Sequence, residues 1–277
     1  MSAEGDPATL VIEASKRWRF LDIPELWAYR EVVFFLVWRD FKVRYRQTAI
    51  GIAWAVIQPM LTVAIFTILF SRLAKLPSDG IPYPLFALAG LVPWVFFSQG
   101  VTAATNGMMN NQDLVKRIYF PRLAIPLAAI FSGFADLVIG LLLLVLMILF
   151  YGQNIGLNIL ALPLFLALGT AAAIGIGLIL SAANVRFRDV GHALPFALQI
   201  ALLATPIAYP SSVLPEHWRL FYNLNPMVGV VDGVRWSLFG TPIVPEALLI
   251  SIATTLLALV GGAFYFRHNE RSLADLL

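Results

Sequence analysis

Few side chains in this sequence are able to do acid–base chemistry, and one of them, Asp136, lies about midway along a long apolar run. An unpaired charge at the centre of a membrane costs about 2.5–3.5 kcal/mol on insertion scales. Proton-driven carriers place several Asp, Glu or His residues at that depth, whereas this run holds a single carboxylate. We therefore expect Asp136 to accept a structural hydrogen bond or to pair with a cation rather than to couple ions.

Glu216, His217 and Asp232 form a second group of titratable residues that could act as acids and bases. His217 is more simply explained as a side chain at a membrane interface. The sequence contains no Gly-x-x-x-x-Gly-Lys-Ser/Thr loop for nucleotide phosphates, no His-Glu-x-x-His helix and no Gly-x-Ser-x-Gly elbow. It has no cysteine, which excludes disulfides and thiolate ligands. We predict no catalytic residue and no metal site, so transport against a gradient would need energy from another polypeptide.

Composition indicates an integral membrane protein, since 60% of the residues are apolar and only 13% are charged. The mean hydropathy is +0.81. A chain of 277 residues has room for about six spans of roughly 20 residues with short loops. Six apolar runs are the predicted spans: Ala49–Phe70, Tyr83–Thr105, Ala124–Phe150, Ile159–Ala183, Leu194–Val213 and Ala247–Phe266.

The distribution of Lys and Arg predicts the orientation of these spans. If the chain crosses the membrane six times, fifteen of its nineteen Lys and Arg residues lie on one side. They are in the N-terminal arm, the second and fourth loops and the C-terminal tail. Because cytoplasmic flanks retain Lys and Arg, we expect both termini in the cytoplasm. The formal charge of +3 does not point to nucleic acid, because the cations lie beside apolar segments. Anionic lipid headgroups are their expected counter-ions.

The segment before the last predicted span, Leu214–Gly240, is too interrupted to cross a bilayer. Asn225 and Pro226 divide it into two short apolar pieces. Asn as the helix cap, followed by Pro at the first helical position, is a favourable helix start. We interpret Leu214–Gly240 as a pair of short helices that dip into the outer leaflet. The alternative is an ordinary external loop with an interfacial helix.

A basic helix is predicted before the first span, over Glu25–Gln47. Its aromatic residues recur at helical spacing, while Arg39, Lys42 and Arg46 form a stripe on another side. Basic helices with an aromatic face lie in membrane interfaces. This helix either acts as a gate beside a transport path or is a passive anchor.

Two loops on the same side as the termini contain the candidates for contact with a partner. Asn110–Arg122 predicts a short helix, with Asn111 as its cap and with Leu114 and Ile118 on one apolar ridge. Such a helix suits a groove on a partner, although it would also fit beneath its own bundle. The charged loop Asn184–His192 either touches the same partner or only sets the orientation of the spans.

Aromatic residues make up 13% of the sequence and include Trp54, Trp94 and Phe97. Aromatic rings stack on sugars and would suit a path for a glycan, but interfacial belts and core packing also use Trp and Phe. The aromatic residues alone therefore do not define a binding site.

Four segments together resemble the transmembrane subunits of polysaccharide-exporting ABC transporters, the type-2 exporters that include O-antigen, capsule and teichoic-acid permeases. They are WRDFKVRYRQTAIGIAWAVIQP (Trp38–Pro59), KRIYFPR (Lys116–Arg122), NVRFRDV (Asn184–Val190) and NLNPMVGVVDGVRW (Asn223–Trp236). Their order and spacing fit, and the resemblance covers nearly the whole chain from about residue 24. The first segment is fairly specific to the polysaccharide branch, whereas the others also resemble drug- and lipid-exporting relatives. Ala49–Ile50 departs from the family, in which larger aliphatic residues are more common there.

The resemblance implies a homodimer with six spans per subunit, paired with two copies of a separate cytoplasmic ABC ATPase. ATP and Mg would be bound by that ATPase, and this chain would bind no cofactor. The implied substrate is a lipid-linked polysaccharide, which would cross the bacterial inner membrane through a channel along the dimer axis.

The resemblance also implies roles for particular residues. The coupling helix that docks into the ATPase would be 111–120, and Asn184–Val190 would be a second contact. The residues implied for ATPase coupling are Asp113, Leu114, Lys116, Arg117, Ile118, Tyr119, Arg186, Arg188 and Asp189. Those implied for the gate or interface helix are Trp38, Arg39, Lys42, Arg44, Tyr45 and Arg46. The channel lining would include Trp54, Trp94 and Phe97, and a re-entrant exit would include Asn225, Pro226, Asp232 and Arg235.

The sequence thus predicts an all-α integral membrane protein with six transmembrane helices, an N-terminal amphipathic interface helix and a re-entrant helix pair before the last span. Its parts are a cytoplasmic arm (1–48), a six-span domain (49–266, with the coupling helix at 111–120 and the re-entrant segment at 214–240) and a cytoplasmic tail (267–277). The alternative functions are export of a small amphipathic drug or lipo-oligosaccharide, a membrane-embedded glycosyltransferase or acyltransferase, and a secondary carrier or channel.

Overall fold

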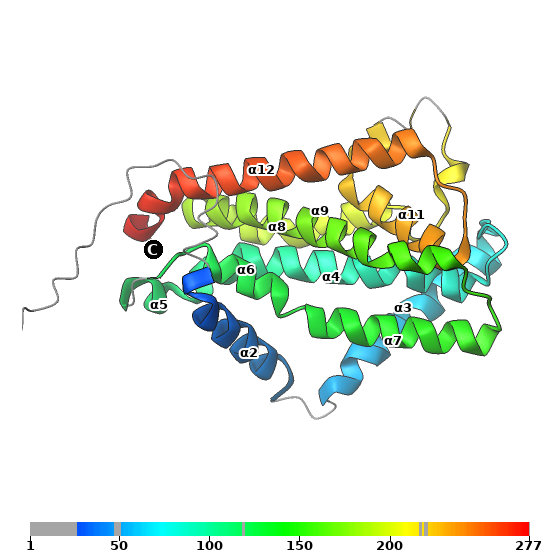
Figure 1. The fold of residues 1–277 in the computed structure, drawn as a ribbon, viewed down its shortest axis with the longest axis horizontal. Coiled ribbons are helices and arrows are strands. Elements are labelled where there is room, and N and C mark those ends of the chain that lie inside the picture. The colour runs from blue at the N-terminus through cyan, green and yellow to red at the C-terminus, as the bar shows by residue number, and fades with distance from the viewer. Residues whose placement is uncertain (1–26, 47–50, 118–119, 216–217, 219–220, 277) are drawn as a thin grey trace, which may run out of the picture.

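The computed structural model describes residues 27–46, 51–117, 120–215, 218 and 221–276. In these residues all the regular structure is helical, and the longest helices run side by side along the long axis of the molecule (Figure 1). Five are long and apolar enough to cross a membrane: Trp54–Leu73, Tyr83–Asn110, Ala124–Tyr151, Leu157–Arg186 and Pro245–Glu270. The prediction of an all-α membrane protein is confirmed at this level.

The centre of the bundle is α4 (Tyr83–Asn110), which is buried along most of its length. It packs against helices on several sides, among them α6, α7, α8 and α11. Leu85, Phe86 and Leu88 on this helix are completely buried. The helix extends five residues beyond the predicted span Tyr83–Thr105, so its last turn reaches the loop that follows.

The first long helix lies at the edge of the bundle. It consists of α3 (Trp54–Phe66) and a π-helical continuation, η2 (Thr67–Leu73), and it follows the short 3-10 turn η1 (Gly51–Ala53). It crosses the other long helices obliquely (Figure 1). Val63 is the only residue of α3 that is fully buried. Most of the apolar surface of α3 is therefore exposed in a single copy of the chain.

The third predicted span, Ala124–Phe150, is interrupted in the structure. It forms α6 (Ala124–Phe131) and α7 (Phe134–Tyr151), separated by Ser132 and Gly133. A Cβ atom on Gly133 would lie 3.2 Å from the carbonyl oxygen of Ile130, so the chain changes direction at a residue without a side chain. The second helix ends at Gly152, whose φ of 63° is favourable for glycine.

The closest helix pair is α8 (Leu162–Arg186), which follows the 3-10 turn η3 (Leu157–Ala161), and α12 (Pro245–Leu276). A Cβ atom on Gly262 would lie 2.2 Å from the carbonyl oxygen of Gly175, so glycines allow the two backbones to touch. The last helix is longer than the predicted span Ala247–Phe266 and continues to Leu276 through the segment predicted as a tail.

The predicted fifth span, Leu194–Val213, has the wrong boundaries. The helix observed is α9 (Asp189–Leu203), which begins five residues earlier and ends ten residues earlier. Its 15 residues extend about 22 Å, less than the roughly 30 Å of a hydrocarbon core. Pro206 lacks an N–H and disfavours helix in the residue before it, which explains the early end. The following segment is irregular apart from the short turn η4 (Ser211–Val213).

The helix predicted to begin at Asn225 is confirmed as α11 (Pro226–Phe239). The Asn225 Oδ1 atom accepts a hydrogen bond from the backbone N–H of Met227 at 3.0 Å, and the helix ends at Gly240 with a φ of 68°. This helix is buried against α4, α8 and α12. Glu216 and His217 lie outside the described residues, so the structure does not describe the first piece of the predicted pair.

One end of the molecule gathers α2 (Arg30–Arg46), α5 (Gln112–Arg117) and the end of α12 (Figure 1). We call it the α5 end, and we call the opposite end, where α11 lies, the α11 end. Leu36 of α2 is buried there together with Phe120, Leu123 and Phe266. The α5 end therefore has a hydrophobic core of its own, which fixes α2 against α6.

Candidate functional site

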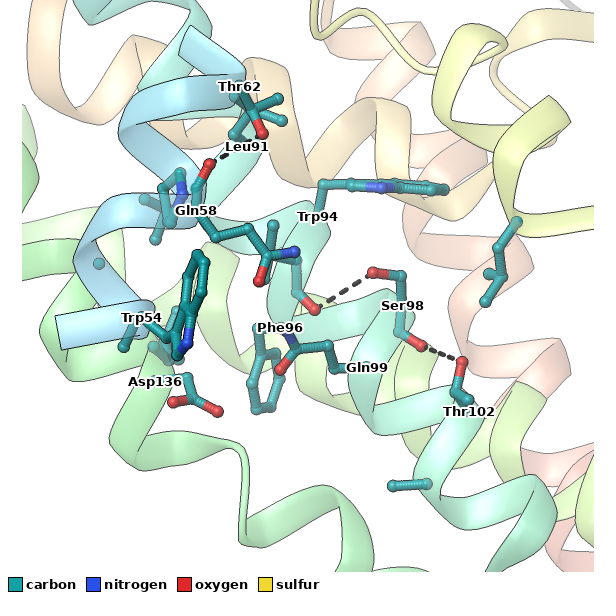
Figure 2. Close-up of a pocket in the computed structure, with 18 of the residues that line it drawn as sticks. Trp54, Gln58, Thr62, Leu91, Trp94, Phe96, Ser98, Gln99, Thr102 and Asp136 are labelled. Carbon is teal, nitrogen blue, oxygen red and sulfur yellow. Dashed lines mark hydrogen bonds between the residues drawn. The ribbon is translucent and has the colours of Figure 1, made fainter. Parts of the chain in front are cut away.

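A cavity of about 870 Å³ lies between α3, α4, α7 and α9. Ligand cavities in proteins typically measure about 300–1,000 Å³. In Figure 2, Trp54 and Gln58 of α3 and Gln99 of α4 point toward the same space, with Asp136 of α7 at its edge. A second cavity, lined by Ser211, Asp232 and Arg235 among others, is smaller, at about 140 Å³.

The α4 wall of the cavity carries a row of polar side chains one helical turn apart, at Ser98, Thr102 and Asn106. The Thr102 hydroxyl donates a hydrogen bond to the carbonyl oxygen of Ser98 at 2.7 Å (Figure 2). The Asn106 amide donates a hydrogen bond to the carbonyl oxygen of Thr102 at 3.1 Å. These bonds hold the side chains against their own helix. The remaining donors and acceptors of hydroxyl and amide groups suit a ligand rich in hydroxyls.

An ion pair lines the cavity where α2 meets the third predicted span. The guanidinium of Arg44 pairs with Asp136 Oδ2 and donates a second hydrogen bond to the hydroxyl of Ser132 at 3.3 Å. Both members of the pair line the cavity, and their side chains are 30% (Arg44) and 13% (Asp136) exposed. The expectation that Asp136 pairs with a cation is confirmed. Its partner comes from a helix more than ninety residues earlier in the chain.

Of the three residues predicted to line the channel, Trp54 and Trp94 line the cavity and Phe97 does not. Trp54 is 46% exposed and Trp94 is 5% exposed, and both line the cavity. Phe97 is not among the lining residues. Its ring packs against that of Trp94 at a centroid distance of 5.6 Å, and the neighbouring Phe96 reaches the cavity instead.

At the α5 end, the polar residues Asp113 and Lys116 are exposed on α5. Leu114 is half-buried and packs against the hydrophobic core of that end, as does Val115. The apolar ridge of this helix is therefore turned partly toward its own bundle. Ile118, Tyr119 and the side chain of Arg117 lie outside the described residues.

The loop between α8 and α9 is also exposed at the α5 end. Arg186, Arg188 and Asp189 all lie on its surface. The guanidinium of Arg186 lies 5.3 Å from the ring centre of Phe187, which is exposed as well. The three predicted contact residues therefore face outward together.

The exposed face of α2 combines aromatic rings and cations. The Lys42 ammonium lies 5.3 Å from the ring centre of Trp38, which is 48% exposed and stacks on Phe41. Arg39 forms an ion pair with Asp40 at 2.7 Å. Tyr45 and Arg46 belong to the helix, but their side chains lie outside the described residues.

Arg235 fixes α11 in the bundle. It is 2% exposed and donates hydrogen bonds to three carbonyl oxygens, those of Phe86 (3.1 Å), Ile207 (2.9 Å) and Pro206. Its guanidinium lies 3.5 Å from the ring centre of Phe86, a cation–π contact. A Cβ atom on Gly90 would lie 2.9 Å from Arg235 Nη2. This arginine therefore joins α11 to α4 and to the segment that follows α9.

Asp232, one turn before Arg235, accepts a hydrogen bond from the Ser211 hydroxyl at 2.5 Å. Burial raises the pKa of Asp232 to about 6, although the hydrogen bond from Ser211 and the charge of Arg235 act in the opposite direction. Glu216 and His217, the other members of the predicted group, lie outside the described residues. Within the described residues there is no group of three or more His, Cys, Asp or Glu that could hold a metal ion.

Sequence reasoning missed the amide residues of the site. Gln58, Gln99 and Asn106 line the cavity, and the buried Asn184 contacts α4 beside it. The four-residue spacing of polar side chains from Ser98 to Asn106, in an otherwise apolar run, is the signal that would have indicated a polar helix face. No comparable spacing marks Gln58 or Asn184.

Comparison with known proteins gives a family match over most of the chain. The model of the family described as ABC-2 type transporter matches residues 31–239. An O-antigen export system permease protein of Myxococcus xanthus is 28% identical over 255 residues, which cover 90% of this chain and 96% of the relative. One from Klebsiella pneumoniae is 25% identical over 240 residues, with 86% and 92% covered. A polysialic acid transport protein of Escherichia coli is 25% identical over 238 residues, with 85% and 92% covered.

Proposed function

Because the chain belongs to the ABC-2 type transporter family, we propose that it is the membrane subunit of an exporter of lipid-linked polysaccharide of the O-antigen or capsule type. It is the multi-pass membrane component, and ATP is hydrolysed by a separate subunit. The relatives that it matches almost from end to end are named for O-antigen export and for polysialic acid transport, which supports a polysaccharide as the substrate.

The observation that carries the proposal is the chemistry of the cavity wall. A sugar chain presents hydroxyl groups and apolar ring faces, and the wall offers Ser, Thr, Asn and Gln groups beside the rings of Trp54 and Trp94. The α4 wall has no charged side chain. Such a surface binds each sugar unit weakly, so the sugar chain is able to slide along the wall. The charged pair Arg44–Asp136 lies on α2 and α7, at the border of this path.

We place a second copy of the chain against α3 and α9. Both helices border the cavity and expose large apolar residues, including Leu61 and Ile65 on α3 and Phe196 and Ile200 on α9. A two-fold axis beside them would bring two such cavities together as one path. In this arrangement α9 and the segment 204–213 form a short sixth crossing, and both termini lie in the cytoplasm with most of the Lys and Arg residues.

The α5 end would then face the ATPase. Asp113, Lys116, Arg186, Arg188 and Asp189 are exposed there on two neighbouring segments. The amphipathic α2 would lie in the cytoplasmic leaflet as the gate helix, tied to the path by Arg44. At the other end, α11 would be the buried member of the re-entrant exit, fixed by Asn225 and Arg235.

The direct test is transport of a lipid-linked glycan by the chain and its ATPase in proteoliposomes. We expect Gln99→Leu combined with Thr102→Val to reduce glycan transport about tenfold, because the wall loses hydrogen bonds to each passing sugar. ATPase activity and co-purification should persist. Leu142→Ala is the matched control, since Leu142 is exposed on the apolar surface of α7. Equal transport by both variants would contradict the assignment of the cavity.

The same assay separates the alternatives. A small amphipathic drug or lipo-oligosaccharide as the true substrate would stimulate ATP hydrolysis more than the long glycan does. Transferase or carrier activity would appear with the purified chain in the absence of the ATPase. We expect neither result.

A further inference from the structure

We propose that Asn184 is a positioning residue that links the exposed α8–α9 loop to the polar wall of the cavity. The inference rests on the proposed function, because it assigns to Asn184 the transmission of a movement from the ATPase contact to the transport path. Asn184 itself is buried and is not among the residues that line the cavity.

The contacts of Asn184 join three helices. It lies two residues before the end of α8 and is 4% exposed. Its Nδ2 atom donates hydrogen bonds to the carbonyl oxygen of Thr105 at 3.0 Å and to Oδ1 of Asn106 at 3.4 Å, both on α4. Its Oδ1 atom accepts from the backbone N–H of Gly191 at 2.8 Å, in the first turn of α9. One buried amide therefore uses both its donor and its acceptor side between helices.

The bond to Gly191 replaces an ordinary helix cap. The first N–H groups of a helix have no partner within it, and a side chain of the residue at the cap usually accepts from one of them. Arg188 occupies the cap position of α9 and makes no such bond. Asn184 supplies the acceptor from the preceding helix instead. The start of α9 is therefore held in place by α8.

A side chain at position 191 would force the amide groups of Asn184 and Asn106 to shift. A Cβ atom on Gly191 would lie 2.9 Å from Oδ1 of Asn184 and 3.0 Å from Oδ1 of Asn106. The glycine thus lets α9 approach both asparagines at once. This close packing accompanies the hydrogen bond from Gly191 to Asn184 and brings the start of α9 close to Asn106 on α4.

The junction has an exposed side and a cavity side. On the exposed side, Arg186, Phe187 and Arg188 form the loop that carries the proposed ATPase contact. On the cavity side, Asn106 lines the cavity and donates to the carbonyl oxygen of Thr102, the next polar residue of the wall. A displacement of the loop changes the Gly191–Asn184 contact and, through it, the position of the Asn106 amide. Coupling then travels through contiguous hydrogen bonds and packed atoms.

The first experiment compares Asn184→Ala with the control Ser181→Ala in proteoliposomes that contain the chain and its ATPase. Ser181 lies one turn earlier on α8, is completely buried, and its hydroxyl has no hydrogen-bond partner in the described part of the chain. We expect Asn184→Ala to keep ATP hydrolysis and assembly but to lower the glycan moved per ATP about five- to tenfold, in the usual range of coupling energies. Ser181→Ala should match the parent. Equal ratios in the two variants would overturn the proposal.

Asn184→Asp separates the cap from the link to α4. The carboxylate still accepts from Gly191 but cannot donate to Thr105 and Asn106. If the link to α4 carries the coupling, Asn184→Asp lowers the transport ratio as Asn184→Ala does. If it behaves like the parent, the residue only caps α9 and the proposal fails. A melting temperature measured on each assembled complex identifies a variant that has merely lost its fold.

A readout that needs no glycan distinguishes failure of this inference from failure of the proposed substrate. The chain has no cysteine, so Ala103→Cys places a single thiol in the cavity wall. We expect ATP to change the rate at which a maleimide labels this thiol in the assembled complex, and Asn184→Ala to abolish that change. If ATP still changes the rate in the Asn184→Ala background, the linkage is wrong, whatever the cargo.

Discussion

At the scale of single residues, the pair Arg44–Asp136 decides where the N-terminal helix meets the bundle. The Asp136 side chain is 13% exposed and the Arg44 side chain 30% exposed, so the pair is partly removed from water. Ser132 accepts a further hydrogen bond from the same guanidinium at 3.3 Å and donates to the carbonyl oxygen of Ala129 at 2.8 Å. The end of α2 is thus attached where the third predicted span is interrupted.

We predict that Asp136→Asn lowers the stability of the purified chain by about 1.5–3 kcal/mol, the range for a hydrogen bond to a charged group. Thermal unfolding in detergent measures the loss. The double variant Asp136→Leu with Arg44→Met should recover part of it, because it removes both charges of the pair together. Arg39→Gln is the control, since the half-buried pair Arg39–Asp40 joins adjacent residues of α2 and holds no second helix. Strictly additive losses at Arg44 and Asp136 would contradict a direct pair.

A second prediction concerns Arg235. Arg235→Met leaves the carbonyl oxygens of Phe86, Pro206 and Ile207 without this donor, and an unsatisfied buried acceptor costs about 1–3 kcal/mol. We expect the chain to lose several degrees of melting temperature and much of its yield. Arg235→Lys should rescue little, because one ammonium cannot reproduce the planar fork of a guanidinium. Arg72→Met, at an exposed arginine, should have no such effect.

At the scale of elements, α8 and α12 owe their contact to two glycines. The Cβ positions of Gly175 and Gly262 are both filled by the backbone of the opposite helix, at 2.5 Å and 2.2 Å respectively. A contact of two backbones cannot be relieved by a change of rotamer. The separation of these helices is therefore fixed by the absence of side chains.

We predict that Gly262→Ala forces α8 and α12 apart and lowers the melting temperature. Gly261→Ala is a closely matched control, because a Cβ atom on Gly261 meets nothing within 4 Å. That control should leave stability unchanged or raise it by up to about 1 kcal/mol, since alanine favours the helix. Similar melting temperatures for the two variants would show that the contact carries no stability.

Elements with a strong local signal were predicted well from the sequence. Asn225 and Pro226 marked the start of α11, and long apolar runs marked the five long helices. The fifth predicted span failed because its apolar run continues past Pro206, so hydropathy did not register the end of α9 at Leu203. Hydropathy also did not indicate the break between α6 and α7 at Gly133, because a glycine does not interrupt a hydrophobic pattern.

The site was less accessible to sequence reasoning than the fold. Asp136 was expected to accept a structural hydrogen bond or to pair with a cation, but its partner Arg44 lies more than ninety residues away in the sequence. Asn184 has the same character, because its importance lies in contacts with Thr105 and Gly191 on two other helices. Such pairings depend on how helices pack. Neither composition nor periodicity contains them.

At the scale of the whole molecule, the exposed apolar faces of α3 and α9 allow a test of the assembly. A single cysteine introduced by Ile200→Cys or Leu61→Cys should be cross-linked to a second copy by a bifunctional maleimide in membranes, because both side chains are exposed beside the cavity. Leu146→Cys, on the exposed face of α7, should stay uncross-linked. Cross-links at Leu146 alone would place the two-fold axis on another face.

The interruption at Ser132 and Gly133 gives the third predicted span a hinge. Ala124, Ile125 and Ala128 on its first half belong to the core of the α5 end, whereas Leu144 and Ile148 on its second half belong to the main core around α4. The start of the first half is thus packed in the core of the α5 end, while Ile130 near its end already belongs to the main core. In the orientation proposed above, with the α5 end in the cytoplasm, a tilt of α2 and α5 would move α6 at this joint while α7 keeps its packing against α4.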